Sequence, residues 1–466
     1  MNRKVSGVII GFIACVGWDL SKRISVRNNR GIAKGKRFLV VGGGFAGVEV
    51  ARGLERLLPG EDNGELTLVN QTDYLLFTPM LTEAVGADVE PHHIIVPLDS
   101  FVRRTNIVVG EVKKIDLKSR TVSIDGQESR TLSTDHLILA LGASSNFHHV
   151  PGAEESAITM KTLEDANRVK EGALALVKRA ASERNSEERA ALLTFVVAGG
   201  GYTGVETIAA LNDLVREAAR RDGVDESEIR MTIAEPLGRL MSEVTEDLAN
   251  YSQKQLQKAG IRVLLNTGVK SAQGDTIELS NGEKIQARTF IWTAGVEANK
   301  LIGELDAPKG KGTALKVTPT LSVEEFNGVW ALGDCAAIPE PNGKGTYAPT
   351  AQNATREGKL VARNIVRSLR GQQQKPFTYT PIGQLALVGR HRGVARVYNQ
   401  NFSGFIAYAM WRMIYLAKMP SMTQRLRVLS DWCLDSLLGP VAKLHPAAAP
   451  KGEKVGPSKQ NAASAR

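Results

Sequence analysis

The sequence predicts an α/β protein built from two similar domains, each with its own parallel β-sheet flanked by helices. The first observation is an internal repeat: "FLVVGGGFAG" at residues 38–47 matches "FVVAGGGYTG" at residues 195–204 without a gap, and both run on into Val-Glu. The second is a length of 466 residues, more than one compact core normally holds. The third is that an apolar, β-branched run precedes each glycine cluster and a helical pattern follows it.

Each glycine cluster has the spacing G-x-G-x-x-G, which is weak evidence alone but gains weight between a strand and a helix. The first glycine permits a sharp turn, the second removes a Cβ that would strike a diphosphate, and the third lets helix and strand pack closely. The diphosphate then meets free N–H groups at the positive helix end. Two aligned copies favour two Rossmann-like dinucleotide sites over turns used for packing alone. Their residues are Gly42, Gly44, Phe45, Ala46 and Gly47 in the first copy, and Gly199, Gly201, Thr203 and Gly204 in the second.

The second strand of each unit should end in a group for the adenosine ribose. In the second copy "RMTIAE" ends in Glu235, whose carboxylate would accept two hydroxyl hydrogen bonds and repel a 2′-phosphate. NADH is therefore predicted over NADPH. In the first copy "ELTLVN" ends in Asn70, which would bind a ribose less strongly. Two dinucleotide sites in one chain indicate a bound flavin and a visiting nicotinamide.

Three further apolar strands end in glycine, at Gly142, Gly295 and Gly333. The first two endings, "HLILALGAS" and "TFIWTAGVE", look like the points where the chain crosses between a flavin domain and a nicotinamide domain. The third, "VWALGDCA", places Asp334 after the glycine. In flavoproteins with two such domains, an Asp here accepts a hydrogen bond from the flavin ribitol, and a surface turn is the alternative.

Charge and cysteine content narrow the function classes. The net charge of +10 is concentrated at the two ends of the chain, which argues against a nucleic-acid partner, because such a binder usually carries basic charge on its folded body. Basic ends suit an anionic membrane surface, or they are merely solvated. The three cysteines, Cys15, Cys335 and Cys433, form no C-x-x-C pair. A disulfide framework, a redox cysteine pair and a metal site are therefore not expected, and Cys335 is predicted to fill apolar space.

Both ends carry apolar segments. Residues 5–18 are apolar but short for a membrane span, and an uncleaved anchor, a signal remnant and a targeting segment all stay open. Residues 404–418 and the stretch after Pro420 predict a helical hairpin in the membrane surface, with Met422, Leu426, Leu429, Cys433 and Leu437 on one face. Its rings Trp411, Tyr415 and Trp432 are of the kind found at membrane interfaces. The alternative is a helix pair that packs on the body or in a homodimer interface.

Three longer stretches add a family resemblance. "YLLFTPMLTEAVGADVEP", "YAPTAQNATREGKLVARNI" and "DWCLDSLLG", together with the glycine loops, resemble the type II NADH dehydrogenases over residues 36–438. These are single-subunit, non-pumping NADH:quinone oxidoreductases with FAD, within the superfamily of flavoproteins with two dinucleotide-binding domains. The resemblance implies a peripheral enzyme, on the cytoplasmic face of a bacterial inner membrane, whose partners are a quinone and the membrane surface.

The resemblance also implies site residues. The first glycine loop with Gly333 and Asp334 would hold FAD, and the second loop with Glu235 would border NADH. Glu206 would lie near the nicotinamide and the flavin, with a helix-capping carboxylate as the alternative. Ala351 and Gln352 match the start of the family's A-Q-x-x-x-Q quinone motif, but Arg356 replaces its second Gln. The implied catalytic residues are Glu206, Gln352 and Arg356.

The implied reaction passes a hydride from NADH to flavin N5 and then two electrons to a membrane quinone. Arg356 motivates a second hypothesis, with a soluble protein or a specialised naphthoquinone as the acceptor. A third is a flavoprotein that signals NADH binding to a partner. The expected domains are an N-terminal segment (1–36), an FAD domain in two parts (37–155 and 291–380) around an inserted NADH domain (156–290), a membrane-association region (381–438) and a disordered tail (439–466).

Overall fold

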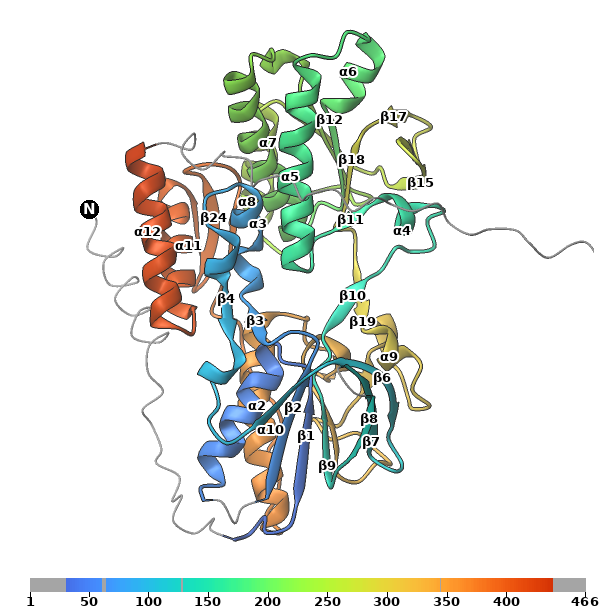
Figure 1. The fold of residues 1–466 in the computed structure, drawn as a ribbon, viewed down its shortest axis with the longest axis vertical. Coiled ribbons are helices and arrows are strands. Elements are labelled where there is room, and N and C mark those ends of the chain that lie inside the picture. Colours follow the sequence, from blue (N-terminus) through green and yellow to red (C-terminus); the bar gives the residue numbers. More distant parts are fainter. Residues whose placement is uncertain (1–30, 61–63, 127–128, 344, 439–466) are drawn as a thin grey trace, which may run out of the picture.

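The computed structural model describes residues 31–60, 64–126, 129–343 and 345–438. Two five-stranded sheets lie one below the other along the long axis of the molecule (Figure 1). The lower sheet has strand order β21-β9-β1-β2-β5, and every neighbouring pair is parallel. Its strands are β1 (Arg37–Val41), β2 (Glu65–Asn70), β5 (Asn106–Val109), β9 (His136–Leu139) and β21 (Val329–Ala331).

The upper sheet repeats this plan with strand order β11-β18-β12-β13-β14, again with parallel neighbours. Its strands are β11 (Ile158–Thr159), β12 (Thr194–Ala198), β13 (Arg230–Ala234), β14 (Ile261–Leu264) and β18 (Thr289–Trp292). The predicted pair of Rossmann-like sheets is confirmed. All strands of the upper sheet fall in sequence between β9 and β21, so the upper unit is inserted in the lower one. Strand β18 runs across the boundary expected at residue 290.

The two units are joined where both sequence-predicted crossings lie. Strands β10 (Ala143–Ser145) and β19 (Val296–Ala298) follow β9 and β18 and pair antiparallel between the sheets (Figure 1). Each unit also carries a three-stranded antiparallel sheet. These are β6 (Glu111–Asp116), β7 (Thr121–Asp125) and β8 (Arg130–Ser133) below, and β15 (Val269–Gln273), β16 (Thr276–Leu279) and β17 (Lys284–Gln286) above.

Helices position the strand ends. Helices α2 (Phe45–Leu57) and α10 (Ala351–Leu369) pack so closely that a Cβ on Gly53 would lie 2.7 Å from the Cβ of Ala362. In the upper unit, α5 (Leu163–Ala180) and α7 (Tyr202–Asp222) contact α3 (Leu81–Val85). In sequence, α3 lies between β2 and β5, two strands of the lower sheet. Smaller elements include β3 (Tyr74–Leu76), β4 (Ile95–Pro97), α4 (Ala153–Ser156), α6 (Ser186–Leu192), α8 (Glu246–Lys258), α9 (Lys300–Gly303), β20 (Leu315–Lys316) and β22 (Ala336–Ala337).

The C-terminal region forms a three-stranded antiparallel sheet followed by two helices on one side of the molecule (Figure 1). They are β23 (Gly383–Leu387), β24 (Gly393–Val397), β25 (Gln400–Gly404), α11 (Phe405–Lys418) and α12 (Met422–Leu438). Within the described ranges, no helix is both long and apolar enough to cross a membrane. The apolar run at residues 5–18 and the tail from residue 439 lie outside the described residues.

Helix α12 turns Gln424, Val428, Asp431 and Trp432 to the body and leaves most of its leucines outside. The Gln424 amide donates to the Ile95 carbonyl at 2.8 Å, and the Asp431 carboxylate accepts from the Glu90 N–H at 3.0 Å. The predicted apolar face of α12 is left outside, with Met422 65 % and Leu437 81 % exposed. Outward-facing side chains on the two helices are Phe405, Ile406, Met413, Met422, Leu426, Leu429, Leu434 and Leu437, here termed the apolar stripe.

The prediction that Trp411 and Trp432 settle at a membrane interface is wrong. Trp411 is 1 % exposed and Trp432 is 6 % exposed, because both rings pack into the core that joins the C-terminal region to the upper unit. The Tyr415 ring is also turned inward, 6.4 Å from the ring of Phe77. Sequence composition alone does not distinguish an interfacial tryptophan from a core tryptophan.

Candidate functional site

The first glycine loop has a different structural reason for each of its three glycines. Gly42 has φ +107°, a backbone conformation that favours glycine, and a Cβ there would strike the Ala140 carbonyl. A Cβ on Gly47 would strike the Gly42 carbonyl, so the start of α2 packs directly on the turn. In contrast, no atom of the described residues lies within 4 Å of the Cβ position of Gly44. That open side, at the N-terminus of α2, is a cradle for a diphosphate.

The second loop repeats this geometry. Gly199 has φ +100°, and a Cβ on Gly204 would strike the Gly199 carbonyl. Gly201, at the N-cap of α7, again has no described atom within 4 Å of its Cβ position. The two loops therefore share one backbone design at two places in the molecule, and both fit a nucleotide diphosphate.

The residues that end the next strand hold these loops. The Gly43 N–H donates to Asn70 Oδ1 at 2.9 Å, while Asn70 Nδ2 donates to the Thr72 carbonyl at 2.9 Å. In the second loop, the Gly200 N–H donates to Glu235 Oε2 at 2.5 Å, and the Leu237 N–H donates to Glu235 Oε1 at 2.8 Å. Asn70 and Glu235 therefore occupy equivalent positions, each hydrogen-bonded to the backbone of its glycine loop.

The late Gly-Asp pair lies against the first loop. Gly333 has φ +71°, and its Cβ position is 3.3 Å from the Cβ of Ala46. Its N–H donates to the Glu357 carboxylate at 2.7 Å, and burial raises the pKa of Glu357 to about 7. Burial also raises the pKa of Asp334, although the charge of Lys161 opposes the shift. The structure thus brings Gly333 and Asp334 to the end of the lower sheet where Gly42, Gly44 and Gly47 lie.

The two crossing glycines have different surroundings. Gly142 has φ +68° and open space at its Cβ position among the described residues. Gly295 has φ +145°, and a Cβ there would lie 2.5 Å from Nε2 of His148. The missing side chain of Gly295 is therefore explained by its histidine neighbour. Cys335 is fully buried beside Leu139 and Leu332, and burial raises the pKa of its thiol to about 12, which fits the predicted space-filling role.

Glu206 does not cap its helix. Its Oε1 accepts from the Leu387 N–H at 2.9 Å, at the end of β23 and far away in sequence, and helix α7 has no side-chain cap hydrogen bond at its N-terminus. Burial raises the pKa of Glu206 to about 8; the Leu387 N–H opposes this shift, and the charge of Glu83 adds to it. The carboxyl group is thus poised to hold a proton at neutral pH, between the second loop and the C-terminal region.

Gln352 and Arg356 lie together at the start of α10. The Tyr379 hydroxyl donates to Gln352 Oε1 at 3.0 Å, and the guanidinium of Arg356 lies 4.0 Å from the centroid of the Tyr379 ring. Arg356 also donates to the Gln352 carbonyl at 2.9 Å. Burial, together with the charge of Arg356, lowers the pKa of Lys418, the last residue of α11, to about 8. Tyr379 and Lys418 are additions that no sequence motif indicated.

A buried polar cluster ties α3 to the C-terminal helices. Glu83 is 2 % exposed; it accepts from Trp432 Nε1 at 2.9 Å and from the Arg412 guanidinium at 3.4 Å. Burial raises the pKa of Glu83, whereas the charge of Arg412 opposes the shift. The only sequence signal was a lone acid within the apolar run "LTEAVG". Through this cluster, α11 and α12 are fixed to α3.

Fold and site together define a protein with two Rossmann-like sheets in one chain, each with a glycine loop at the start of a helix and joined by the pairing of β10 with β19. A family model described as pyridine nucleotide-disulphide oxidoreductase matches residues 36–358, well over half of the chain. The chain therefore belongs to that family. A second model, the NDH2 C-terminal domain, matches residues 382–440.

Individual relatives agree with this assignment. A probable NADH dehydrogenase of Dictyostelium discoideum is 26% identical over 438 residues, which cover 90% of this chain and 94% of the relative. A type II NADH:quinone oxidoreductase of Staphylococcus saprophyticus is 27% identical, with 81% of this chain and 94% of the relative covered. Among solved structures, NDH2 from Plasmodium falciparum in complex with NADH has a TM-score of 0.81 at 19% identity, covering 87% of this chain and 99% of that one. The resemblance to type II NADH dehydrogenases is confirmed.

Proposed function

We propose that this protein oxidises NADH with bound FAD and passes the electrons to a quinone at a membrane surface, without pumping protons. The observation that carries the proposal is the pair of glycine loops in one chain, each with a central glycine whose Cβ side is open. The family match and the relatives named as NADH:quinone oxidoreductases support the same reaction.

The described residues fit FAD in the lower unit. Gly44 leaves room for a diphosphate at the start of α2, and Asp334, beside Gly333, provides a carboxylate for the ribitol. When bound, FAD accepts a hydride from NADH and gives two electrons to the acceptor. The protein need not supply a nucleophile, so its own residues bind, orient and move protons.

The NADH site is assigned to the second loop. Gly201 and the N-terminus of α7 receive the diphosphate, and Thr203 lies exposed in the first turn of that helix. Glu235 is held by two backbone N–H groups, which fix its direction and leave acceptor capacity for the ribose hydroxyls. Its negative charge disfavours the 2′-phosphate of NADPH.

Proton supply to the acceptor is assigned to Glu206. A two-electron reduction of a quinone consumes two protons, and a carboxyl group with its pKa raised to about 8 can donate one at neutral pH. Gln352 and Arg356 are assigned to the acceptor side, with Tyr379 and Lys418 as neighbours. A cation here stabilises negative charge that develops on a reduced quinone.

The apolar stripe is assigned to the membrane surface. Leu426 and Leu429 are 61% and 43% exposed, although the same helix turns Asp431 inward. These outward-facing leucines expose apolar area to water unless lipid covers it. Basic residues toward both chain ends would add attraction to anionic lipid. Attachment to the cytoplasmic face of a bacterial inner membrane and a homodimer both stay predictions.

The reaction is tested with the purified protein. It should be yellow with a flavin spectrum, NADH should bleach it without oxygen, and a soluble quinone should restore the colour over many turnovers. Bleaching with no turnover on any quinone would favour the alternative acceptor, a soluble protein, or a signalling role. A colourless protein that gains no flavin on reconstitution would contradict the proposal.

The membrane assignment is tested by flotation with anionic liposomes. Leu426→Gln combined with Leu429→Gln should weaken binding by at least ~10-fold, because each fully buried leucine contributes about 1.5–3 kcal/mol. The matched control is Thr423→Gln combined with Ser430→Gln, which changes exposed polar positions on the same helix. Bleaching by NADH should be unchanged in both variants. Equal flotation of the two double variants would refute the stripe as the membrane face.

A further inference from the structure

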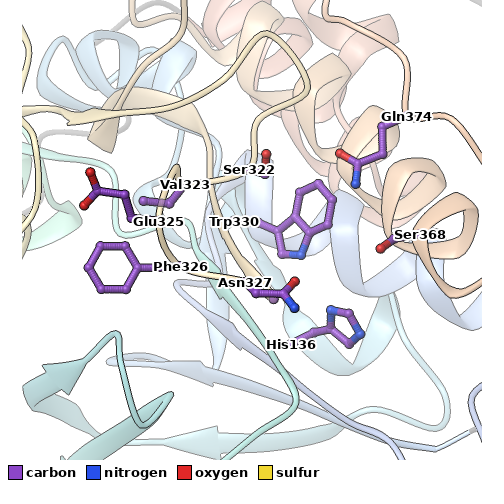
Figure 2. A pocket seen from close by; sticks show the side chains of 10 residues that line it. His136, Ser322, Val323, Glu325, Phe326, Asn327, Trp330, Ser368 and Gln374 are labelled. Carbon is purple, nitrogen blue, oxygen red and sulfur yellow. The ribbon is translucent and has the colours of Figure 1, made fainter. Parts of the chain in front are cut away.

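The lower unit contains a cavity at the opposite end of its sheet from the first glycine loop. Its volume is about 420 Å³, within the size range of small-molecule sites. His136, at its edge, is the first residue of β9 and pairs in register with Phe38 near the start of β1, whereas Gly42 follows the end of that strand. The polar and aromatic side chains around it include His136, Ser322, Asn327, Trp330, Ser368 and Gln374 (Figure 2).

Trp330 presents an unused hydrogen-bond donor to this cavity. The residue is 2 % exposed, its backbone is held in β21 opposite Ile138, and its indole ring lies at the centre of the lining (Figure 2). Its Nε1 is buried and has no hydrogen-bond partner among the described residues. An indole N–H can only donate, and a buried donor without an acceptor is destabilising. An acceptor that enters the cavity, either a ligand or an ordered water, would supply the missing partner.

His136 offers a second unused nitrogen close by. Its Nδ1 is buried and also lacks a partner within the described part of the chain. Stacking on Phe38, with ring centroids 5.2 Å apart and planes at 9°, fixes the imidazole ring. Burial lowers the pKa of His136 to about 4; the Asp135 charge opposes this shift, and those of Lys36 and Arg120 add to it. The imidazole is thus neutral at physiological pH and provides one donor and one acceptor nitrogen.

The rim of the cavity adds neutral amide and hydroxyl groups on a fixed backbone. Asn327, Gln374 and Ser368 face it from two separate segments (Figure 2). The Asn327 carbonyl accepts from the Arg120 guanidinium at 3.1 Å, which holds the turn. Exposed Glu325 adds a carboxylate to the same rim, which disfavours an anion. Such a lining suits an uncharged ligand with both donors and acceptors.

We propose that this cavity binds a small, planar, uncharged heterocycle whose edge carries a carbonyl acceptor beside an N–H donor, as in a pyrimidine base. The carbonyl accepts from Trp330 Nε1, and the neighbouring edge pairs with His136 Nδ1 and the Asn327 amide. The flat ring packs on the indole. Strand β21 leads from Trp330 to Gly333 and Asp334, so a single short strand connects the cavity to the opposite end of the sheet, where FAD is proposed to bind. Binding itself does not depend on the proposed reaction.

The probe is 5-fluorouracil, followed by ¹⁹F NMR line broadening in a titration of the full-length, FAD-loaded protein. Saturating NAD⁺ keeps the second glycine loop occupied. Wild-type protein should bind the probe, and Trp330→Phe, which removes the N–H together with part of the indole ring, should weaken binding by at least about tenfold, the effect of one good hydrogen bond. Gln374→Ala should also weaken binding, whereas Gln373→Ala, an exposed neighbour outside the lining, should not.

Thermal unfolding provides a second readout that a purely structural tryptophan would not give. Without probe, Trp330→Phe loses packed ring atoms as well as a buried unpaired donor, so its own melting temperature is the reference for the variant. With probe, wild-type protein should gain melting temperature and the variant should gain less. No binding to wild-type protein, equal binding to Trp330→Phe, or equal binding of the planar anion benzoate would each overturn the proposal. So would a crystal structure soaked with the probe in which ordered water alone satisfies Trp330 and His136.

Discussion

The two glycine loops are built alike, yet the residues that support them differ in charge. Asn70 accepts a hydrogen bond from the Gly43 N–H at 2.9 Å, and Glu235 accepts one from the equivalent Gly200 N–H at 2.5 Å. Asn70 then donates its own amide to Thr72 and completes a neutral network within the protein. Glu235 only accepts, from a second backbone N–H, and keeps a negative charge beside the loop.

This difference explains how one backbone design serves two nucleotides. A carboxylate has about four acceptor positions, of which Glu235 uses two on the protein. The others are available to ribose hydroxyls of a nucleotide that comes and goes. The amide of Asn70 has less acceptor capacity to spare, so under the proposed assignment the first loop would rely more on diphosphate contacts and on the late Gly-Asp pair.

A second contrast lies one turn into each helix, where the repeat places the same residue. Glu49 is partly exposed, and its Oε1 lies 3.8 Å from a guanidinium nitrogen of Arg52. Glu206 at the equivalent position is covered by β23 and bonded to Leu387. The C-terminal region packs on the second copy of this helix, and that packing turns a partly exposed acid into a buried one.

The largest effects are expected from filling the open sides of the loops. Gly44 and Gly201 have extended backbone angles that valine tolerates, and their Cβ positions meet no described atom, so both variants should fold. Gly44→Val should lose FAD, whereas Gly201→Val should stay yellow but resist bleaching. A loss of at least ~100-fold in nucleotide affinity, about 3 kcal/mol, is expected when the diphosphate contact is blocked. Flavin absorbance measures FAD retention, and bleaching during an NADH titration measures NADH binding.

These two variants also test whether the sites are separate. If Gly201→Val released FAD, or if Gly44→Val kept FAD and lost only NADH, the assignment of the loops would be reversed or wrong. Circular dichroism of both variants controls for folding.

Glu206→Gln is expected to give the next largest effect, with Glu49→Gln as the matched control. Loss of a general acid should slow quinone reduction by about 100-fold while NADH bleaching continues. The wild-type rate should fall above a pH of about 8, where the Glu206 carboxyl ionises, and the glutamine variant should lack this limb. A rate that is unchanged, or a pH profile that survives the substitution, would remove Glu206 from proton supply.

The same shift makes a stability prediction. The pKa of Glu206 is raised from 4.5 to about 8 on folding, so the folded state holds this proton more tightly than the unfolded state. The contribution of this group to stability is therefore present below pH 4.5 and is lost as the pH rises toward about 8. Denaturant unfolding of wild-type and Glu206→Gln protein at pH 5 and pH 9 should show the variant gaining relative stability at pH 9.

Local patterns predicted the scaffold, because strand–glycine–helix units are local in sequence. The glycine spacing placed both loops, and the apolar run at residues 404–418 predicted α11, which spans Phe405–Lys418. Long-range contacts were beyond such reasoning. Glu83 depends on Arg412, 329 positions away, and the burial of Trp432 depends on the same cluster. The local pattern of apolar residues can be read from a sequence, but the distant cation that pairs with a buried acid cannot.

The smallest effect is expected from Glu235→Gln, which converts the second loop toward the neutral support of the first. The amide keeps the side-chain length but loses the charge, so the KM for NADH should rise by about tenfold, the effect of one weakened charge-assisted hydrogen bond. Discrimination against NADPH should fall, because the repulsion of its 2′-phosphate is removed. The reciprocal change, Asn70→Asp, should leave nicotinamide selectivity alone and weaken FAD retention, since a carboxylate would face the Thr72 carbonyl. Steady-state kinetics with both nucleotides decide the matter: unchanged selectivity in Glu235→Gln would mean that its carboxylate serves only to brace Gly200 and Leu237.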